Sequence, residues 1–400
     1  MSPRRHLLVV GHGMTGHRLM EEVHRRDRDR RWHITAVTDE SRPAYDRIAL
    51  TSALAGDGPA RLGLRPDPCT RVRTGVSVTA VDPRSRTATL DRGTELVWDA
   101  LVLATGSRPF VPPVPGHDLP GCHVLRTYDD LRAIRAAAVP GRPGLVVGGG
   151  LLGLEAAGAL RHLGMRPHVV ETAPHLMPMQ LDRAGGGLLA GLVGALGITP
   201  HCGTPLHAVH AGPGGRVAGV TLAGGRSLPA ELVIFAAGIR PRDELAAAAA
   251  LPRGERGGFL VDDRCRTRAP GIWAIGECAA VRGRTYGLVA PGYRMAETVA
   301  RQLTDDAEGP PLPPLDTSAR LKLLGVEVAS FGDAHARTPG AVEFAHRTGG
   351  TYRKLVLAGD GRTLLGGVLV GDASAYPRLT PLLDRPLPAN PEDLLAPVPG

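Results

Sequence analysis

Three glycines near the start of the chain have a spacing suited to holding a phosphate group. Gly11, Gly13 and Gly16 follow the apolar residues 7–10 and precede an amphipathic stretch that starts at residue 17. In a strand–turn–helix unit the first glycine allows a tight turn. The second lets the backbone approach a pyrophosphate, and the third lets helix and strand pack closely. The N-terminus of the helix offers N–H groups and a positive dipole end to the phosphates. For one such motif alone, an ordinary glycine-rich turn is the alternative.

The same pattern occurs a second time, at residues 148–153 (Gly-Gly-Gly-Leu-Leu-Gly), again after a short apolar run. In both copies a second apolar segment ends in acidic residues. Asp39 and Glu40 follow this segment in the first copy, and Glu171 ends it in the second. A carboxylate at this place accepts hydrogen bonds from ribose hydroxyls. Two complete units therefore predict two dinucleotide sites in one chain.

The charge of the chain does not indicate a nucleic-acid partner, although 47 basic residues against 39 acidic ones leave a net charge of +8. The one dense arginine cluster, residues 25–31, contains Asp27 and Asp29 and reads as a solvated loop. Aromatic residues, which would stack on bases, make up only 4% of the chain. We therefore expect no nucleic acid partner.

The cysteines favour a reducing compartment. They are odd in number, far apart and without metal-ligand spacing: Cys69, Cys122, Cys202, Cys265 and Cys278. The longest apolar stretch, residues 145–160, is interrupted by glycines and Glu155, so we expect no membrane span. These features predict a cytoplasmic protein with no metal site.

Between the motifs, hydrophobic patterning predicts the remaining elements. Residues 1–40 form the first βαβ unit, 48–55 a short helix, 70–98 a small antiparallel insertion and 100–104 a buried strand. Residues 120–237 form the second unit, 246–250 a short helix and 291–303 a longer one that starts with a proline. Residues 316–383 form strands with a terminal helix at 377–383, and the proline-rich tail from Pro386 is expected to be poorly ordered.

This layout resembles the pyridine nucleotide-disulfide oxidoreductase superfamily. The resemblance rests on the two glycine motifs with their acids, the Ala104-Thr105-Gly106 turn, the Ala237-Gly238 turn and residues 275–277. It implies that the first motif holds FAD and the second NAD(P)H. The late motif of that family is usually Gly-Asp, and Gly276-Glu277 is a conservative departure from it. The implied fold class is α/β, with two Rossmann-like dinucleotide-binding domains and a C-terminal α+β interface domain. The implied domains are 1–115 and 239–308 for FAD, 116–238 for NAD(P)H, 316–385 for the interface and 386–400 for the tail.

Longer strings are similar to the N-terminal module of the assimilatory NAD(P)H nitrite reductase large subunit. They are residues 45–47, 176–178, 180–182, 276–279, 286–293, 322–326 and 365–372. That subunit continues into a [2Fe-2S] module and a sirohaem/[4Fe-4S] module. The sequence has no cysteine after Cys278, so it resembles the electron-entry part alone.

The resemblance assigns cofactor-binding residues but no catalytic side chain, because the flavin carries the redox chemistry. For FAD they are Gly11, Gly13, Met14, Gly16, Asp39, Glu40, Arg47, Val78, Ala104, Thr105, Gly106, Gly276, Glu277 and Pro291. For NAD they are Gly148, Gly150, Leu151, Leu152, Gly153, Glu155, Glu171, Ala237 and Gly238.

Several of these residues have specific expected roles. Glu155 matches a residue near the nicotinamide, or is simply an acid at a helix N-terminus. Arg47 matches a position near FAD, or is a surface arginine. Glu171 favours NADH over NADPH. The helix that begins near Pro291 directs its positive end at the flavin, and Cys278 reads as a packing residue rather than a redox thiol.

The function expected is that of an FAD-dependent NADH oxidoreductase in nitrite or nitrate assimilation. Its electrons pass to a separate acceptor, an iron–sulfur, sirohaem or molybdopterin enzyme. A rubredoxin or ferredoxin reductase outside nitrogen metabolism is the alternative enzyme. A non-enzymatic, NADH-responsive flavoprotein is the alternative from another class. Residues 316–383 are the candidate surface for docking or for a homodimer, or merely cover the flavin.

Overall fold

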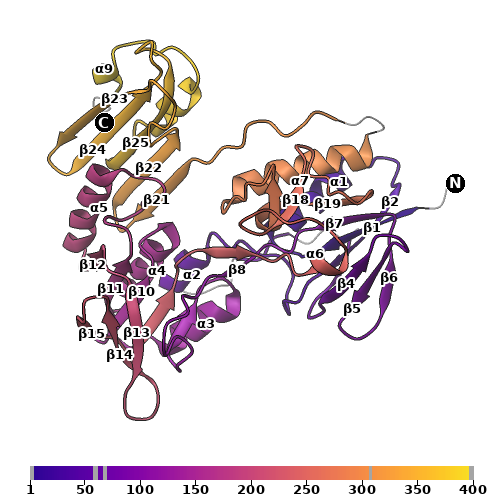
Figure 1. The fold of residues 1–400 in the computed structure, drawn as a ribbon, viewed down its shortest axis with the longest axis horizontal. Coiled ribbons are helices and arrows are strands. Elements are labelled where there is room, and N and C mark those ends of the chain that lie inside the picture. Colours follow the sequence, from indigo (N-terminus) through magenta and orange to yellow (C-terminus); the bar gives the residue numbers. More distant parts are fainter. Residues whose placement is uncertain (1–3, 57–61, 66–69, 306–308, 396–400) are drawn as a thin grey trace. The chain divides into compact units, whose positions relative to one another are not determined.

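The computed structural model describes residues 4–56, 62–65, 70–305 and 309–395. They form two compact units, each assembled from separate parts of the chain (Figure 1). The first unit draws on Met1–Ile48, Ala60–Arg108 and Ile239–Thr317, and the second on Ala49–Pro59, Pro109–Gly238 and Ser318–Gly400. Among the described residues, no helix combines the length and the apolar composition needed to cross a bilayer.

A five-stranded parallel sheet forms the centre of the first unit. Its strands in spatial order are β19 (Ile272–Ala274), β7 (Ala100–Leu103), β1 (Arg5–Val10), β2 (Trp32–Val37) and β3 (Thr70–Arg73). The side chains of β7 are all buried, as expected for a parallel sheet covered on both faces. Two long helices, α1 (Met14–Arg26) and α7 (Val289–Thr304), pack side by side.

Smaller elements complete this unit. Three strands form an antiparallel sheet, β4 (Val78–Asp82), β5 (Thr87–Leu90) and β6 (Glu95–Val97). Two pairs of short strands follow, β8 (Ser107–Pro109) with β17 (Ile239–Pro241) and β18 (Phe259–Val261) with β20 (Ala279–Val281). The short helices are α6 (Leu245–Ala248) and the 3-10 helix η1 (Gly276–Cys278).

Two details of the first unit differ from the sequence-based expectation. Residues 70–98 are not all an antiparallel insertion, because β3 pairs in parallel with β2 and extends the main sheet. Helix α7 begins at Val289, two residues before Pro291. A proline is tolerated there because the first turn of a helix has no acceptor for its N–H.

The second unit contains another five-stranded parallel sheet. In spatial order its strands are β12 (Thr199–Cys202), β11 (Arg166–Glu171), β10 (Pro143–Val147), β16 (Leu232–Phe235) and β9 (Cys122–Val124). Its helices are α2 (Leu50–Ala55), α3 (Tyr128–Ala137), α4 (Leu151–His162) and α5 (Arg183–Ala195). A three-stranded antiparallel sheet is made of β13 (Leu206–Ala211), β14 (Val217–Leu222) and β15 (Ser227–Pro229).

Helix α2 belongs to the second unit, although the segments before and after it in the sequence belong to the first. The expected domain boundaries put residues 48–55 with the first nucleotide site, but α2 packs on α3 and α4 of the second unit. Leu50 and Leu54 are its buried side chains. The second site therefore includes a segment that precedes it in the chain by about a hundred residues.

The C-terminal part of the second unit is an antiparallel sheet with small helices. Its strands in spatial order are β21 (Ala319–Leu323), β22 (Val326–Gly332), β25 (Leu364–Gly371), β24 (Thr351–Leu357) and β23 (Val342–Thr348). The helices are α8 (Tyr376–Leu379), the 3-10 helix η2 (Thr380–Leu382) and α9 (Pro391–Leu395). Leu395 is buried and its carbonyl accepts a hydrogen bond from Arg353, so the expected disorder of the tail does not hold for α9.

A buried lysine joins this sheet to α5. Lys354 of β24 is 1% exposed, and its Nζ lies 2.7 Å from Asp182 Oδ2 and 3.1 Å from Glu343 Oε2. Tyr352 donates a hydrogen bond to the same Asp182 oxygen at 2.8 Å. Asp182 also caps α5, because its side chain accepts the N–H of Gly185. Burial alone would raise the pKa of Asp182, but these hydrogen bonds hold it below its usual value.

Candidate functional site

The first glycine loop connects β1 to α1, and its three glycines meet different constraints. Gly11 has a φ of +107°, and a Cβ there would lie 2.1 Å from the carbonyl oxygen of Ala104. A Cβ on Gly16 would lie 2.4 Å from the carbonyl oxygen of Gly11. On Gly13, however, it would meet nothing nearer than the Arg47 side chain at 3.8 Å. The outer glycines are required by the packing of the loop itself, whereas the middle one leaves room for an occupant.

The second glycine loop, between β10 and α4, repeats this arrangement. Gly148 has a φ of +114°, and its Cβ would lie 2.4 Å from the carbonyl oxygen of Ala236. That of Gly153 would lie 1.8 Å from the carbonyl oxygen of Gly148. A Cβ on Gly150 would meet nothing within 4 Å. In both loops the first glycine packs against the turn that follows a neighbouring strand, and free space is left at the middle glycine.

The helices that follow the loops begin without a side-chain cap. Gly13 is the N-cap of α1 and Gly150 that of α4, and neither helix has an acid in its first turn. By contrast, Thr127 and Asp182 cap α3 and α5 with their side chains. Uncapped first-turn N–H groups and the positive dipole end form an anion-binding site. The residues present therefore fit a pyrophosphate at each loop. Met14 belongs to the first turn of α1, and Leu151 and Leu152 to that of α4.

The acids of the first site have separate partners. Glu40 accepts a hydrogen bond from the hydroxyl of Tyr45 at 2.7 Å and forms an ion pair with Arg47. The guanidinium of Arg47 lies 4.9 Å from the centre of the Tyr45 ring. Asp39 instead pairs with Arg242 at 2.7 Å. The structure therefore brings Gly13, Glu40 and Arg47 together and leaves Asp39 in another contact.

His12, inside the first loop, holds the segment that carries Tyr45 and Arg47. Its Nδ1 accepts the N–H of Ala44 at 3.2 Å, and the ring is buried. Burial, with His17 nearby, lowers the pKa of His12 to about 4, so it is neutral at pH 7. Neither His12 nor Tyr45 was among the expected site residues. The signals for them were a histidine inside a glycine loop and, for Tyr45, its place in the string of residues 45–47, two residues before Arg47.

The late motif meets the first turn of α1. A Cβ on Gly276 would lie 3.1 Å from Thr15 Oγ1, and one on Gly292, next to Pro291, would lie 2.6 Å from the same atom. Glu277 accepts a hydrogen bond from the hydroxyl of Ser107 at 2.8 Å. The start of α7 and the late motif thus converge on the first loop. Sequence reasoning missed Thr15, one of the three variable positions within the motif.

The turn after β7 is held in place by the backbone. The N–H of Ala104 donates to the carbonyl of Val10 at 2.7 Å, and the carbonyl of Gly106 accepts the N–H of Arg242 at 2.9 Å. Thr105 donates its hydroxyl to the carbonyl of Arg242. Val78 lies on β4, opposite Leu90, and packs against the hydrophobic core of the first unit.

In the second site, Glu171 bridges two backbone segments. Its carboxylate accepts the N–H of Gly149 and that of Ala173, each at 2.7 Å. The turn after β16 lies beside this loop. Gly238 has a φ of +111°, nothing lies within 4 Å of where its Cβ would be, and its carbonyl accepts the N–H of Phe110 at 2.8 Å. Ala237 precedes it on the same turn.

Glu155 lies one turn into α4 and is partly buried. The hydroxyl of Thr51, on α2, donates a hydrogen bond to its Oε2 at 3.1 Å. Burial raises the pKa of Glu155 above its usual value, and this hydrogen bond offsets part of the rise. Thr51 was not an expected site residue. It lies 104 positions before Glu155 in the sequence, and no sequence pattern linked the two residues.

Comparison with known proteins identifies the family. Residues 5–301 match the family described as pyridine nucleotide-disulphide oxidoreductase. The chain belongs to this family. Residues 318–386 match the rubredoxin NAD+ reductase C-terminal domain. The family resemblance and the α/β fold expected from the sequence are confirmed.

Three proteins show how far the similarity to individual oxidoreductases extends. The chain is 45% identical to the nitrite reductase NAD(P)H large subunit of Klebsiella oxytoca, over 98% of this chain and 41% of that protein. It is 32% identical to the assimilatory nitrate reductase electron transfer subunit of Bacillus subtilis, over 94% of this chain and 49% of that protein. A crystal structure of a ferredoxin reductase for the CYP199A2 system from Rhodopseudomonas palustris aligns with a TM-score of 0.86, at 26% identity over 98% of both chains. The chain thus spans less than half the length of the two curated relatives.

Membership of this oxidoreductase family implies FAD and NADH as cofactors. Disulfide reductases of the family would need a pair of redox cysteines. Among the described residues the four cysteines are unpaired, and Cys69 lies outside them. Cys278 is fully buried, and its thiol contacts the carbonyl oxygens of Ile275 and Leu103 at 3.2 and 3.4 Å. Burial raises the pKa of this thiol, so it stays protonated and packs as an apolar residue.

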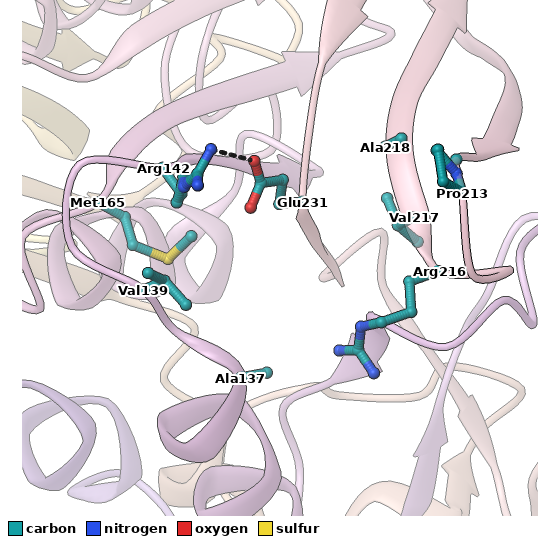
Figure 2. A pocket seen from close by; sticks show the side chains of 10 residues that line it. Ala137, Val139, Arg142, Met165, Pro213, Arg216, Val217, Ala218 and Glu231 are labelled. Atoms are coloured by element: carbon teal, nitrogen blue, oxygen red, sulfur yellow. Dashed lines mark hydrogen bonds and ion pairs between the residues drawn. The ribbon is translucent and has the colours of Figure 1, made fainter.

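A separate pocket of about 270 Å³ lies in the second unit (Figure 2). Arg142 and Glu231 form an ion pair of 3.2 Å in its wall, and Met165, Val139 and Val217 supply apolar surface. None of the expected site residues lines it. Within the described residues no group of three or more His, Cys, Asp and Glu side chains is arranged to hold a metal ion.

Proposed function

We propose that this chain is an electron-entry flavoprotein that oxidises NADH and passes the electrons to a separate redox protein. The observation that carries the proposal is the pair of glycine loops, each open at its middle glycine and each followed by an uncapped helix. The family match supports FAD at the first loop and NADH at the second. FAD, when bound, supplies the redox chemistry, since it takes a hydride and releases electrons singly.

The residues of the chain bind and orient the two nucleotides in this proposal. The N–H groups at the start of α1 and α4 hold the pyrophosphates. Glu40 and Glu171 are assigned to the adenosine riboses, and Arg47 to the phosphates of FAD, because its guanidinium lies beside the open middle glycine. The N-terminus of α7 is assigned to the flavin ring, where a positive dipole end stabilises added negative charge. Glu155 is assigned to the nicotinamide end of NADH.

Glu171 supports NADH over NADPH as the donor. A carboxylate that already accepts two N–H groups repels the 2′-phosphate of NADPH. The residues next to it, Thr172 to Pro174, supply no cation for that phosphate.

We propose that the acceptor belongs to nitrite or nitrate assimilation, because two relatives are named as a nitrite reductase large subunit and a nitrate reductase electron transfer subunit. The chain matches less than half of either relative, so its acceptor is assigned to another polypeptide or to another part of a longer one. A rubredoxin or ferredoxin acceptor is the second candidate. It is supported by the match of residues 318–386 and by the fold of the ferredoxin reductase.

A cytoplasmic location is proposed from the unpaired cysteines.

Stopped-flow spectroscopy tests the proposal in two steps. Mixing the FAD-loaded protein with NADH is expected to bleach the flavin absorbance in milliseconds to seconds. Adding a sirohaem or molybdopterin enzyme, a rubredoxin or a ferredoxin then shows which acceptor restores it. Slow bleaching with no competent acceptor would favour a non-enzymatic, NADH-responsive flavoprotein.

A second assay separates electron entry from chemistry on nitrite. With NADH, the isolated chain is expected to reduce ferricyanide but to form no ammonium from nitrite. Stoichiometric ammonium without a partner or an added metal cofactor would contradict the proposal.

A further inference from the structure

The pocket of about 270 Å³ in the second unit lies at the edge of the parallel sheet where its strands begin. Three lining residues directly precede a strand: Arg142 precedes β10, Met165 precedes β11 and Glu231 precedes β16. The second glycine loop follows the other end of β10. The five residues of this strand span roughly 16 Å. A molecule in the pocket would therefore not overlap a nucleotide at the glycine loop.

The charges that line the pocket do not balance. Arg142 and Glu231 form an ion pair of 3.2 Å, so their charges cancel. Arg216 is the third charged residue of the lining, and Figure 2 shows its guanidinium directed into the pocket. Within the part of the chain that the structure describes, this guanidinium has no ion pair and no hydrogen-bond partner. Two arginines and one glutamate therefore give the pocket a net charge of +1.

The nearby histidine does not change this balance. Burial, together with the charge of Arg216, lowers the pKa of His123, so its ring is neutral at pH 7. The free charge of the pocket thus remains that of Arg216, and the group that would complement it is an anion.

The backbone around Arg216 is held by the hairpin that joins β13 to β14. The carbonyl of Arg216 accepts the N–H of Gly212 at 2.8 Å, and the carbonyl of Gly212 accepts the N–H of Gly215 at 3.1 Å. Val217 is buried, and its N–H donates to the carbonyl of Pro120 at 2.9 Å. Because the turn is already ordered, binding of an anion by Arg216 does not have to fix its backbone.

The size and the apolar surface of the pocket restrict its occupant further. Pockets for drug-sized ligands usually measure about 300–1,000 Å³, so this one suits a smaller molecule and not a dinucleotide. A guanidinium can donate two parallel hydrogen bonds to a carboxylate. A single carboxylate also balances the net charge of +1, whereas a doubly charged phosphate would leave an excess beside Glu231. Apolar surface for the rest of the molecule comes from Val139, Met165 and Val217.

We propose that this pocket is a second ligand site, which binds a small organic carboxylate with one negative charge and an apolar body. Arg216 binds the carboxylate, and Val139, Met165 and Val217 contact the apolar body. The site uses none of the residues assigned to FAD or NADH, so this inference does not rest on the proposed function.

A ligand-observed NMR titration of the FAD-loaded protein with phenylacetate tests the proposal. This probe has one carboxylate and one apolar ring, and we expect a dissociation constant on the order of 1 mM. Acetate lacks the apolar body and phenylacetamide lacks the charge, so each is expected to bind at least about fivefold more weakly. No binding of phenylacetate at tens of millimolar, or equal binding of the neutral amide, overturns the proposal.

Two variants locate the bound probe. Arg216→Gln removes the charge that binds the carboxylate, so it is expected to weaken phenylacetate binding about tenfold or more. Val139→Asp places a second acid in the pocket and is expected to weaken binding to a similar extent. Both side chains are exposed, that of Val139 at 49%, so both variants should fold.

The matched control is Arg132→Gln, which makes the same change at an exposed residue of α3 that does not line the pocket. It is expected to leave the dissociation constant for phenylacetate unchanged. Equal weakening by this control, or unchanged binding by Arg216→Gln, overturns the assignment of the carboxylate to Arg216.

Competition with NAD+ tests whether the site is separate. Saturating NAD+ is expected to leave phenylacetate binding unchanged, because the pocket and the second glycine loop lie at opposite ends of β10. Displacement of phenylacetate by NAD+ would place the probe in the nucleotide site and overturn the proposal. Flavin reduction by NADH is measured separately, so a failure of the proposed function is distinguishable from a failure of this inference.

Discussion

The hydroxyl of Thr51 donates a hydrogen bond to the carboxylate of Glu155 at 3.1 Å. Thr51 comes from helix α2, whose sequence neighbours belong largely to the first unit, and Glu155 lies on the helix that follows the second glycine loop. Burial raises the pKa of Glu155, and Thr51 opposes that rise by binding the charged form. The ionisation of a group assigned to the nicotinamide end thus depends on a residue from a distant segment.

We predict that Thr51→Val moves the pH dependence of NADH binding. Without the donated hydrogen bond the carboxylate is less stable, so the pKa of Glu155 rises further. The inflection attributed to Glu155 in a plot of NADH affinity against pH is expected to move to higher pH. Thr51→Ser, which keeps the hydroxyl, is the control and should leave it in place. An inflection that persists in Glu155→Gln would show that another group titrates.

Glu155 also has a predicted effect on stability. Its pKa is higher in the folded protein than in the unfolded chain, so the folded state binds the proton more tightly. Its contribution to stability is present at low pH and is lost as the pH rises through its folded pKa. Thermal unfolding of Glu155→Gln and wild type, compared from about pH 4 to 8, should therefore favour the variant increasingly with rising pH. A constant difference across this range would contradict the prediction.

Substitutions at two glycines of the first loop are predicted to have different effects, one on FAD binding and the other on stability. Gly13→Glu places a carboxylate where a pyrophosphate approaches, and the space around Gly13 lets the protein fold. The purified variant is expected to be folded and colourless. Gly11→Ala forces a Cβ to within 2.1 Å of a backbone oxygen at a φ of +107°, so it should lose about 3 kcal/mol or more of stability. Absorbance at the flavin bands and chemical unfolding measure these outcomes. A yellow Gly13→Glu protein with normal FAD content would contradict the assignment of the loop.

Glu171→Ala is predicted to change both nucleotide preference and stability. Loss of the carboxylate should weaken NADH binding about tenfold or more and improve NADPH relative to NADH. Because Glu171 also accepts the N–H groups of Gly149 and Ala173, the variant should lose roughly 1–3 kcal/mol of stability as well. Glu171→Gln keeps one acceptor oxygen, so its NADH affinity and its stability are expected to lie between those of wild type and Glu171→Ala. Steady-state kinetics with both nucleotides, together with thermal unfolding, separate the two effects.

The two lysines of the chain form a matched pair for a test of stability. Lys354→Met leaves Asp182 and Glu343 without their shared cation, and because these carboxylates are 24% and 46% exposed the expected loss is about 1–3 kcal/mol. Lys322 pairs with Glu327 at the surface, with its side chain 71% exposed, so Lys322→Met should cost about 1 kcal/mol or less. Chemical unfolding of both variants gives the comparison. Equal losses would show that the buried cluster has no special part in stability.

The parts of the site that follow from local backbone geometry were predictable from the sequence. Gly11 and Gly148 occupy conformations that other residues rarely adopt, so each position requires a glycine, and the repetition of the glycine spacing between a strand and a helix predicted both loops. Residues recruited through space were not predictable, since Thr51, His12 and Tyr45 act through contacts with distant parts of the chain or through local burial. The pairing of β3 was also missed. Its alternating Thr-Arg-Val-Arg sequence suits an antiparallel hairpin as well as the edge of a parallel sheet.

The interleaving of the two units bears on how the chain folds as it leaves the ribosome. The central sheet of the first unit contains β1 and β19, and it cannot be completed until Ile272 pairs with Leu101. The parallel sheet of the second unit uses only residues from Cys122 to Phe235. The unit that starts second along the chain can therefore finish its sheet first. During synthesis, β7 remains an open, wholly apolar edge for the time needed to make roughly 170 further residues, the kind of surface that chaperones bind.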